Sequence, residues 1–180
     1  MTRIIAGEAR GRRLQVPVGD ATRPTSDRAR EGLFSSLHSL GDVEGARVLD
    51  LYAGSGALGL EALSRGAVSA TLVEDDPLAL NAIRDNVATT RLEGAFVVPM
   101  KVQVFLASDA EPRYDVVFVD PPYADDVGPT LSALVPWLAE DAVVAVERPT
   151  RGPELSWPEG LRAERSRRYG EATLWYATRC

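Results

Sequence analysis

Between residues 46 and 148, short apolar runs alternate with segments whose apolar side chains recur every three or four positions. A short apolar run is typical of a buried strand, and the three-to-four spacing is typical of an amphipathic helix. The pattern predicts strands at 47–51, 70–73, 96–98, 114–119 and 142–146, and helices at 57–65, 77–87, 102–107 and 129–138. The run at 114–119 is so apolar that it should be a central strand, buried on both faces. Strands that alternate with helices predict an α/β fold with a doubly wound, mainly parallel sheet.

The two ends of the chain carry patterns of a different kind. Short apolar stretches around two glycines predict an N-terminal β-hairpin within residues 3–16. Thr25 or Ser26 then caps a helix whose apolar positions follow the helical spacing to Leu40. Near the C-terminus, residues 162–178 predict a closing antiparallel hairpin.

Length and composition fit one globular domain of ordinary size. The chain has 180 residues, of which 45% are apolar and 26% are charged. No apolar run approaches the roughly 18 residues that span a bilayer, and the N-terminus has no signal-peptide core. One cysteine and one histidine provide neither a disulfide framework nor a metal cluster. We therefore expect a single cytoplasmic domain, with a basic N-terminal extension at 1–40, a core at 41–180, no metal and no membrane contact.

Charge is distributed unevenly along the chain. The formal net charge is -6, yet residues 1–30 hold seven arginines and only three acidic residues. Four more arginines lie between residues 162 and 168. A basic segment on an acidic body suits a protein that meets phosphates with one face. Ordinary solvated arginines give the same pattern, so charge alone leaves both interpretations open.

A glycine-rich turn follows the first strand of the predicted core. That strand ends at Asp50, and the turn contains Gly54 and Gly56. Glycines let a ligand approach the backbone closely, and the helix after the turn presents free N–H groups. A carboxylate at the strand end suits a cationic group such as an α-ammonium, and Glu74 after the next strand can bind ribose hydroxyls. Together they favour S-adenosylmethionine over a dinucleotide, with a purely structural turn as the alternative.

Asp120, Pro121, Pro122 and Tyr123 follow the most apolar strand of the chain. Two successive prolines form a stiff, extended corner with free carbonyls, and the carboxyl end of a central strand is where such folds bind ligands. Asp120 and a proline carbonyl can accept hydrogen bonds from an amino group, and Tyr123 can stack on a base. An exocyclic amine needs such acceptors, because they hold the N–H bonds and point the lone pair at the methyl carbon. The motif predicts methyl transfer to a base amine, although a Pro-Pro turn can also merely end a strand.

This motif resembles the Asp/Asn-Pro-Pro-Tyr/Phe signature of amino-group methyltransferases that act on DNA and RNA. The N-terminal block, which comprises residues 3–7, 11–14 and 22–34, is similar to that of one bacterial family. Residues 52–66 and 168–174 are similar to the same family. The family is that of the 16S ribosomal RNA guanine-N2 methyltransferases, which modify the small ribosomal subunit. The resemblance extends over nearly the whole chain.

That resemblance implies a Rossmann-like class I methyltransferase fold, S-adenosylmethionine as cofactor, and 16S RNA in the 30S subunit as partner of a monomer. The cofactor would be held by Asp50, Tyr52, Ala53, Gly54, Ser55, Gly56, Glu74 and Asp75. The guanine would be held by Asp120, Pro121, Pro122 and Tyr123. The RNA would be contacted by Arg10, Arg12, Arg13, Arg23, Arg28 and Arg30.

Two positions depart from the family pattern. Family members usually have Gly where this chain has Ala6, which is a mild change. Family members carry Asp or Asn, which reaches the adenine amino group, where this chain has Lys101. Lysine cannot accept a hydrogen bond, so adenine recognition would fall to a backbone carbonyl or weaken.

Two other functions remain open. A DNA adenine-N6 methyltransferase shares the Pro-Pro-aromatic corner, but it usually has a separate target-recognition domain, for which 180 residues leave no room. An RNA-binding ribosome-assembly factor with an inactive cofactor pocket is the second alternative. The intact glycine turn and the intact Asp120 motif argue against it.

Overall fold

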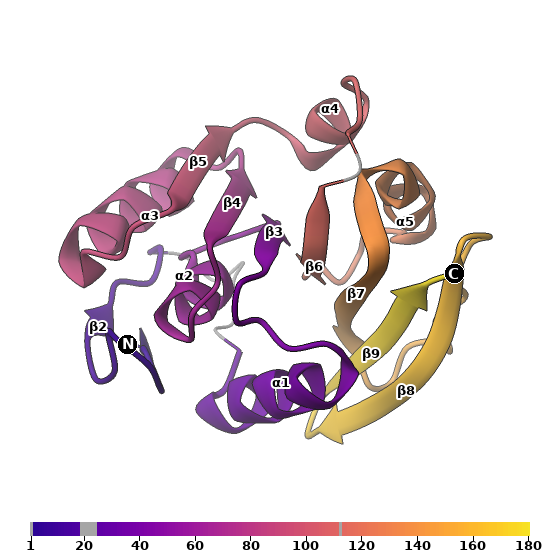
Figure 1. Cartoon of the computed structure of the whole chain (residues 1–180), viewed down its shortest axis with the longest axis horizontal. Coiled ribbons are helices and arrows are strands. Elements are labelled where there is room, and N and C mark those ends of the chain that lie inside the picture. Colours follow the sequence, from indigo (N-terminus) through magenta and orange to yellow (C-terminus); the bar gives the residue numbers. More distant parts are fainter. Residues whose placement is uncertain (1, 19–24, 112) are drawn as a thin grey trace.

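A seven-stranded sheet forms the centre of the molecule (Figure 1). The structure is a computed structural model that describes residues 2–18, 25–111 and 113–180. In spatial order the strands are β5 (Ala95–Pro99), β4 (Ser69–Glu74), β3 (Arg47–Leu51), β6 (Tyr114–Val119), β7 (Leu138–Pro149), β9 (Ala172–Arg179) and β8 (Leu161–Tyr169). The first five are parallel, and β9 is antiparallel to both β7 and β8. The predicted mainly parallel sheet and the C-terminal antiparallel hairpin are both confirmed.

Helices cover both faces of this sheet. They are α1 (Asp27–Leu40), α2 (Ala57–Ser64), α3 (Pro77–Thr90), α4 (Val102–Leu106) and α5 (Gly128–Leu134). One apolar cluster includes Leu33 of α1, Leu60 of α2 and Ile83 of α3. A second cluster, on the opposite face, includes Phe105 of α4 and Leu131 of α5. The result is a three-layer α/β/α arrangement with the sheet in the middle.

Strand β6 is central, as its apolar sequence predicts. Val116 and Phe118 belong to the cluster on one face, whereas Val117 and Val119 belong to the cluster on the other. Successive side chains of a strand point to opposite faces, so both sides of β6 are buried. The residue that follows, Asp120, therefore emerges at the middle of the sheet's carboxyl edge.

The N-terminal hairpin consists of β1 (Thr2–Arg3) and β2 (Arg13–Leu14), which pair antiparallel. Glu61, on α2, accepts hydrogen bonds from the backbone N–H groups of Ile5 (2.8 Å) and Ala6 (3.1 Å). The Glu61 side chain is fully buried and forms ion pairs with Arg65 (2.8 Å) and Arg30 (3.8 Å). A buried carboxylate thus ties the hairpin to the layer that carries the glycine turn.

The predicted helix at 129–138 is too long at its C-terminal end. Helix α5 stops at Leu134 and is followed by a 3₁₀ turn, η1 (Val135–Trp137). Pro136 explains the change, because proline has no N–H to donate and its ring clashes with the preceding turn of an α-helix. β7 then begins at Leu138 and runs to Pro149, well beyond the predicted 142–146. The extension places Glu147 and Arg148 inside the strand.

The described helices are short. The longest, α1 and α3, have 14 residues each. Within residues 2–18, 25–111 and 113–180, no helix has the length and apolar content needed to cross a membrane. In those same segments, no group of three or more His, Cys, Asp or Glu residues is arranged to hold a metal ion.

Candidate cofactor and substrate site

The β3–α2 turn lies where the order of the parallel strands reverses. β3 pairs with β4 on one side and with β6 on the other, and such a switch point opens a crevice at the carboxyl ends of the strands. Tyr52, Gly54 and Gly56 all have positive φ, of 60°, 58° and 80°. A Cβ atom at Gly54 would meet no protein atom within 4 Å. The Gly54 backbone therefore faces open space, which a ligand can enter.

Glu74, the last residue of β4, is bonded to this turn. Its Oε1 accepts a hydrogen bond from the Gly54 N–H at 2.9 Å, and its Oε2 accepts from the N–H groups of Asp75 (2.9 Å) and Asp76 (3.1 Å). A carboxylate has about four acceptor positions, so these bonds leave capacity for ribose hydroxyls. The other predicted cofactor residues in the turn are Tyr52, Ala53, Ser55 and Gly56.

Asp50 lies inside the protein, below the turn. It is 1% exposed, and its Oδ2 accepts a hydrogen bond from the Gly59 N–H at 3.0 Å. Burial is the main cause that raises the pKa of Asp50 to about 8; the Gly59 bond opposes the rise and the charge of Glu74 adds to it. The carboxyl group is therefore largely protonated at neutral pH, and a cationic group beside it would favour loss of that proton.

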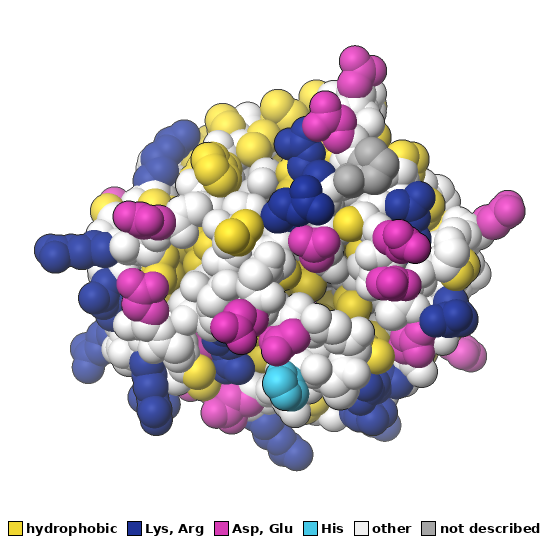
Figure 2. All heavy atoms as spheres, viewed as in Figure 1, with side chains coloured by type: hydrophobic (Ala, Val, Ile, Leu, Met, Phe, Trp, Pro, Cys, Tyr) yellow, Lys and Arg dark blue, Asp and Glu magenta, His cyan; other side chains and the backbone are white. Residues whose placement is uncertain are grey.

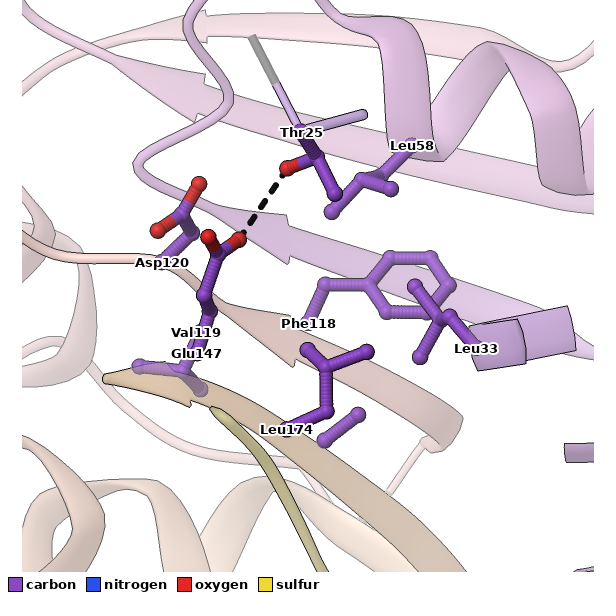
Figure 3. A pocket seen from close by; sticks show the side chains of 9 residues that line it. Thr25, Leu33, Leu58, Phe118, Val119, Asp120, Glu147 and Leu174 are labelled. Carbon is purple, nitrogen blue, oxygen red and sulfur yellow. Dashed lines mark hydrogen bonds between the residues drawn. The ribbon is translucent and has the colours of Figure 1, made fainter. Parts of the chain in front are cut away.

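Asp120 stands next to a second acid, Glu147. The register of β6 and β7 pairs Val119 with Val146, which sets Asp120 and Glu147 side by side at adjacent strand ends. Figure 3 shows both carboxyl groups directed toward the same pocket. Burial, followed by the charges of Glu147 and Asp50, raises the pKa of Asp120 well above its usual value. Burial likewise raises the pKa of Glu147.

The sequence analysis missed Glu147, although a signal was present. Glu147 comes directly after the apolar run 142–146, just as Asp120 comes directly after 114–119. An acid at the carboxyl end of a parallel strand points to the same edge of the sheet as the other strand ends. Glu147 Oε2 also accepts a hydrogen bond from the Thr25 hydroxyl at 3.0 Å (Figure 3).

Arg148, also missed, holds the backbone of the proline corner. Its guanidinium donates to the carbonyls of Pro122 (3.3 Å), Tyr123 (3.0 Å) and Asp125 (2.9 Å). Within the described part of the chain, no such bond reaches the Pro121 carbonyl. Pro121 is itself buried, and its carbonyl has no hydrogen-bond partner among the described residues.

Comparison with known proteins places the chain in a family. Residues 2–178 match the family described as Conserved hypothetical protein 95. The chain is 45% identical over 148 residues to the Ribosomal RNA small subunit methyltransferase D of Escherichia coli K12, and the match covers 81% of this chain and 73% of that protein. The protein of the same name from Haemophilus influenzae is 38% identical over 151 residues, which cover 81% and 77%. The chain belongs to this family.

Solved structures agree with that membership. The Escherichia coli protein yhhF has a TM-score of 0.87 at 39% identity, with 99% of this chain and 97% of that chain covered. The Thermus thermophilus protein TTHA0928 has a TM-score of 0.83 at 37% identity, with 98% of each chain covered. The family resemblance expected from the motifs is confirmed over nearly the full length.

Three of the arginines predicted to hold RNA are exposed in this family member: Arg10, Arg13 and Arg28. Arg12 is also exposed, but its guanidinium donates to the Thr90 carbonyl at the end of α3. Arg23 lies outside the described residues. Figure 2 shows basic side chains along the left and lower rim of the molecule, on the side where Figure 1 places the hairpin and α1.

The prediction for Arg30 is wrong, because this residue is 0% exposed. Its guanidinium donates to the Thr2 hydroxyl at 2.7 Å and to Asp27 at 2.8 Å, and it lies 3.8 Å from Glu61. The side chain therefore joins α1 to the hairpin and to α2. The sequence held a signal for this burial, because Leu33 and Leu37 lie three and seven residues after Arg30 and place it on the apolar face of α1.

Lys101 immediately precedes α4 and is exposed, with no side-chain bond to the helix start. It stands after β5, beyond the strand that carries Glu74. A lysine there offers donors only.

Proposed function

We propose that this chain transfers the methyl group of S-adenosylmethionine to the exocyclic N2 amine of a guanine in 16S ribosomal RNA. In this proposal it acts as a monomer on the assembled small subunit. The observation that carries the proposal is the position of the Asp120 carboxyl and the unbonded Pro121 carbonyl at the strand edge that also holds the open turn at Gly54. The names of the relatives from Escherichia coli and Haemophilus influenzae support ribosomal RNA as the substrate.

The two acceptors would hold the two N–H bonds of the guanine N2 amine. With those bonds fixed, the nitrogen lone pair turns away from the ring plane toward the methyl carbon. A carbon–nitrogen bond forms while the sulfur–methyl bond breaks, and the bonding electrons leave with sulfur. The amine then loses a proton to Asp120 or to water. Catalysis by such positioning can contribute several kcal/mol.

The cofactor would be held by the residues around the β3–α2 turn. It supplies an activated methyl group on a sulfonium centre. The absence of a side chain at Gly54 leaves room for its methionine moiety, and Glu74 would bind its ribose. Asp50 and Asp75 complete the proposed set. The positive φ at Gly54 also disfavours other residues there, which fits a turn shaped for a ligand.

The guanine ring would stack on Tyr123, which is 49% exposed beside the proline corner. RNA phosphates would be met by the exposed arginines of the N-terminal block and α1, Arg10, Arg12, Arg13 and Arg28. The choice of RNA substrate would then depend on the N-terminal block and on the shape of the ribosomal particle.

The test is to incubate the protein with tritiated S-adenosylmethionine and one of three substrates: naked 16S RNA, 30S particles or genomic DNA. The modified nucleoside is then identified by mass spectrometry. We expect N2-methylguanosine from the 30S particles and none from Asp120→Ala. Transfer to DNA, or N6-methyladenosine as the product, would overturn the proposal. If none of the three substrates is labelled while the protein still binds S-adenosylhomocysteine, the result would favour an RNA-binding assembly factor instead.

A further inference from the structure

Glu147 faces the same space as Asp120 and is fixed by two elements. It projects from β7 on the same sheet face as Asp120 does from β6, because Val119 and Val146 are paired in the parallel register. The two carboxyl groups lie close enough for the charge of Glu147 to raise the pKa of Asp120. Thr25, just before α1, donates its hydroxyl to Glu147 Oε2 at 3.0 Å. The Glu147 carboxyl is therefore held in one orientation beside the proposed amine site.

The pocket that these acids share offers acceptors to a ligand. Its described lining is Thr25, Leu33, Leu58, Phe118, Val119, Asp120, Ala145, Glu147 and Leu174 (Figure 3). The polar members are Thr25 and the two acids, and the Thr25 hydroxyl already donates to Glu147. Both acids are partly exposed, so a base edge would meet them at the surface; the space enclosed behind them is about 10 Å³, enough for about one water molecule. Such a pair selects a ligand with two adjacent N–H donors.

Guanine has two adjacent donors on its Watson–Crick edge, N1–H and the N2 amine. Adenine instead places an N1 lone pair beside its amine, and that lone pair would face a carboxyl oxygen. We infer that Glu147 is the residue that selects guanine: it accepts the N1–H while Asp120 and the Pro121 carbonyl accept the N2 amine. This inference rests on the proposed guanine-N2 function and adds a specificity-determining residue to it. Reading a base through its Watson–Crick edge is how other enzymes that act on single bases choose them.

Electrostatics support the assignment. Two acids packed together repel each other once both are ionised, and this repulsion adds to burial in raising the pKa of Asp120. Two N–H donors placed between them would reduce the repulsion and favour the ionised forms. An acceptor in the same place would increase it. The two carboxyl groups therefore favour a base edge with two N–H donors over a base edge that carries an acceptor.

The experiment compares two preparations of reconstituted 30S particles that differ only in the target base. The first carries the target guanine in its 16S RNA; the second has 2-aminopurine at that position, which keeps the 2-amine but has neither the N1–H nor the 6-oxo group. We expect the wild-type protein to favour guanine by about 10- to 100-fold in kcat/KM, the range of one specific base contact. In Glu147→Gln the amide can donate to the 2-aminopurine N1, so the preference should collapse to within about threefold. Glu140→Gln, an exposed acid on the same strand, is the matched control and should keep the wild-type preference.

Two further readouts separate recognition from structure. Thr25→Val, which removes the hydroxyl bonded to Glu147, should narrow the same preference while leaving both acids in place. In Glu147→Gln the acidic limb of the kcat/KM profile should also move to lower pH. In this variant Asp120 no longer has the negative charge of Glu147 beside it, so the pKa of Asp120 falls. Asp50 on β3 and Arg148 on β7 still face Asp120.

The failures can be told apart. If wild-type protein makes N2-methylguanosine with a clear guanine preference and Glu147→Gln keeps that preference, the inference is overturned and the proposed function stands. If wild-type protein makes N6-methyladenosine or transfers nothing, the proposed function fails and the inference fails with it.

Discussion

Gly54 is the residue whose missing side chain matters most for the proposed cofactor site. Gly54→Val adds a branched side chain in space that holds no atom of another part of the chain within 4 Å of the Cβ, although the positive φ (58°) strains any residue other than glycine there. We expect this variant to lose S-adenosylhomocysteine binding in calorimetry. Gly45→Val is the matched control, because Gly45 also has positive φ (74°) and open space around its Cβ. Normal binding by Gly54→Val would place the cofactor elsewhere.

The buried Asp50 predicts a dependence of stability on pH. Its pKa is about 8 in the folded protein and near 3.9 when unfolded, so the folded state binds more protons between these values. The free energy of unfolding should therefore fall as pH rises from 5 to 8, by up to about 1.4 kcal/mol per pH unit from this group. Asp50→Asn should reduce the slope, and Asp120 leaves a residual slope of the same sign. Denaturant unfolding at each pH measures the free energy of unfolding. If this free energy changes with pH equally in the wild type and in Asp50→Asn, the raised pKa of Asp50 is contradicted.

At this scale the sequence predicted the residues that belong to contiguous motifs. Asp120 with its prolines, and the glycine turn with Glu74, could be located because neighbours in the chain share one site. Arg148 could not, because the carbonyls that it binds lie more than 20 residues away. Glu147 could have been noticed as an acid directly after an apolar run, but its place beside Asp120 depends on strand register. Arg30 was misassigned because burial decides whether an arginine meets RNA.

At the scale of elements, the C-terminal end of β7 fixes the proline corner. Arg148 donates to three carbonyls of residues 122–125, and a fork of donors cannot be replaced by a single ammonium. Arg148→Ala should lower kcat by about 10- to 100-fold, because the acceptors lose their alignment, while cofactor affinity stays unchanged. Arg148→Lys should recover little of the loss. Steady-state kinetics and calorimetry measure both quantities.

The exposed Arg151, three residues further along the chain, is the control for charge alone. Arg151→Ala should retain the wild-type kcat. If Arg148→Ala also retains the wild-type kcat, the proline corner keeps its geometry without Arg148.

Most elements were predicted with their type and order correct, because buried strands and amphipathic helices have different spacings of apolar residues. The errors lie between the end of helix α5 and the start of β7, where the helical spacing and the strand pattern overlap. Pro136 and the apolar residues around it extend the helical spacing past Leu134, although the backbone there already turns toward β7. The exposed acids Glu140 and Asp141 interrupt the apolar run, so an apolar-run criterion misses the start of β7.

At the scale of the whole molecule, an acidic protein is proposed to bind RNA with one basic face. Arg10, Arg13 and Arg28 are exposed on the hairpin and α1, so changing all three to Ala should weaken binding to 16S RNA. The slope of log affinity against log salt should fall by about 2 units, near 0.7 per lost phosphate contact. Filter binding at salt concentrations between about 50 and 200 mM measures the slope. S-adenosylhomocysteine affinity should not change.

Arg113→Ala removes an exposed arginine at the opposite, amino end of β6 and serves as the control. It should leave the slope near that of the wild type. An unchanged slope in the triple variant would assign Arg10, Arg13 and Arg28 to ordinary solvated surface.

The central claim is that Asp120 orients the amine for methyl transfer, and single-turnover kinetics with 30S particles and saturating cofactor test it most directly. Asp120→Ala removes the carboxyl acceptor at the end of β6 but leaves the β3–α2 turn untouched. We expect the rate of methyl transfer to fall by orders of magnitude, while the Kd for S-adenosylhomocysteine stays within a few-fold of the wild-type value. An Asp120→Ala protein that transfers methyl groups at the wild-type rate would contradict the central claim.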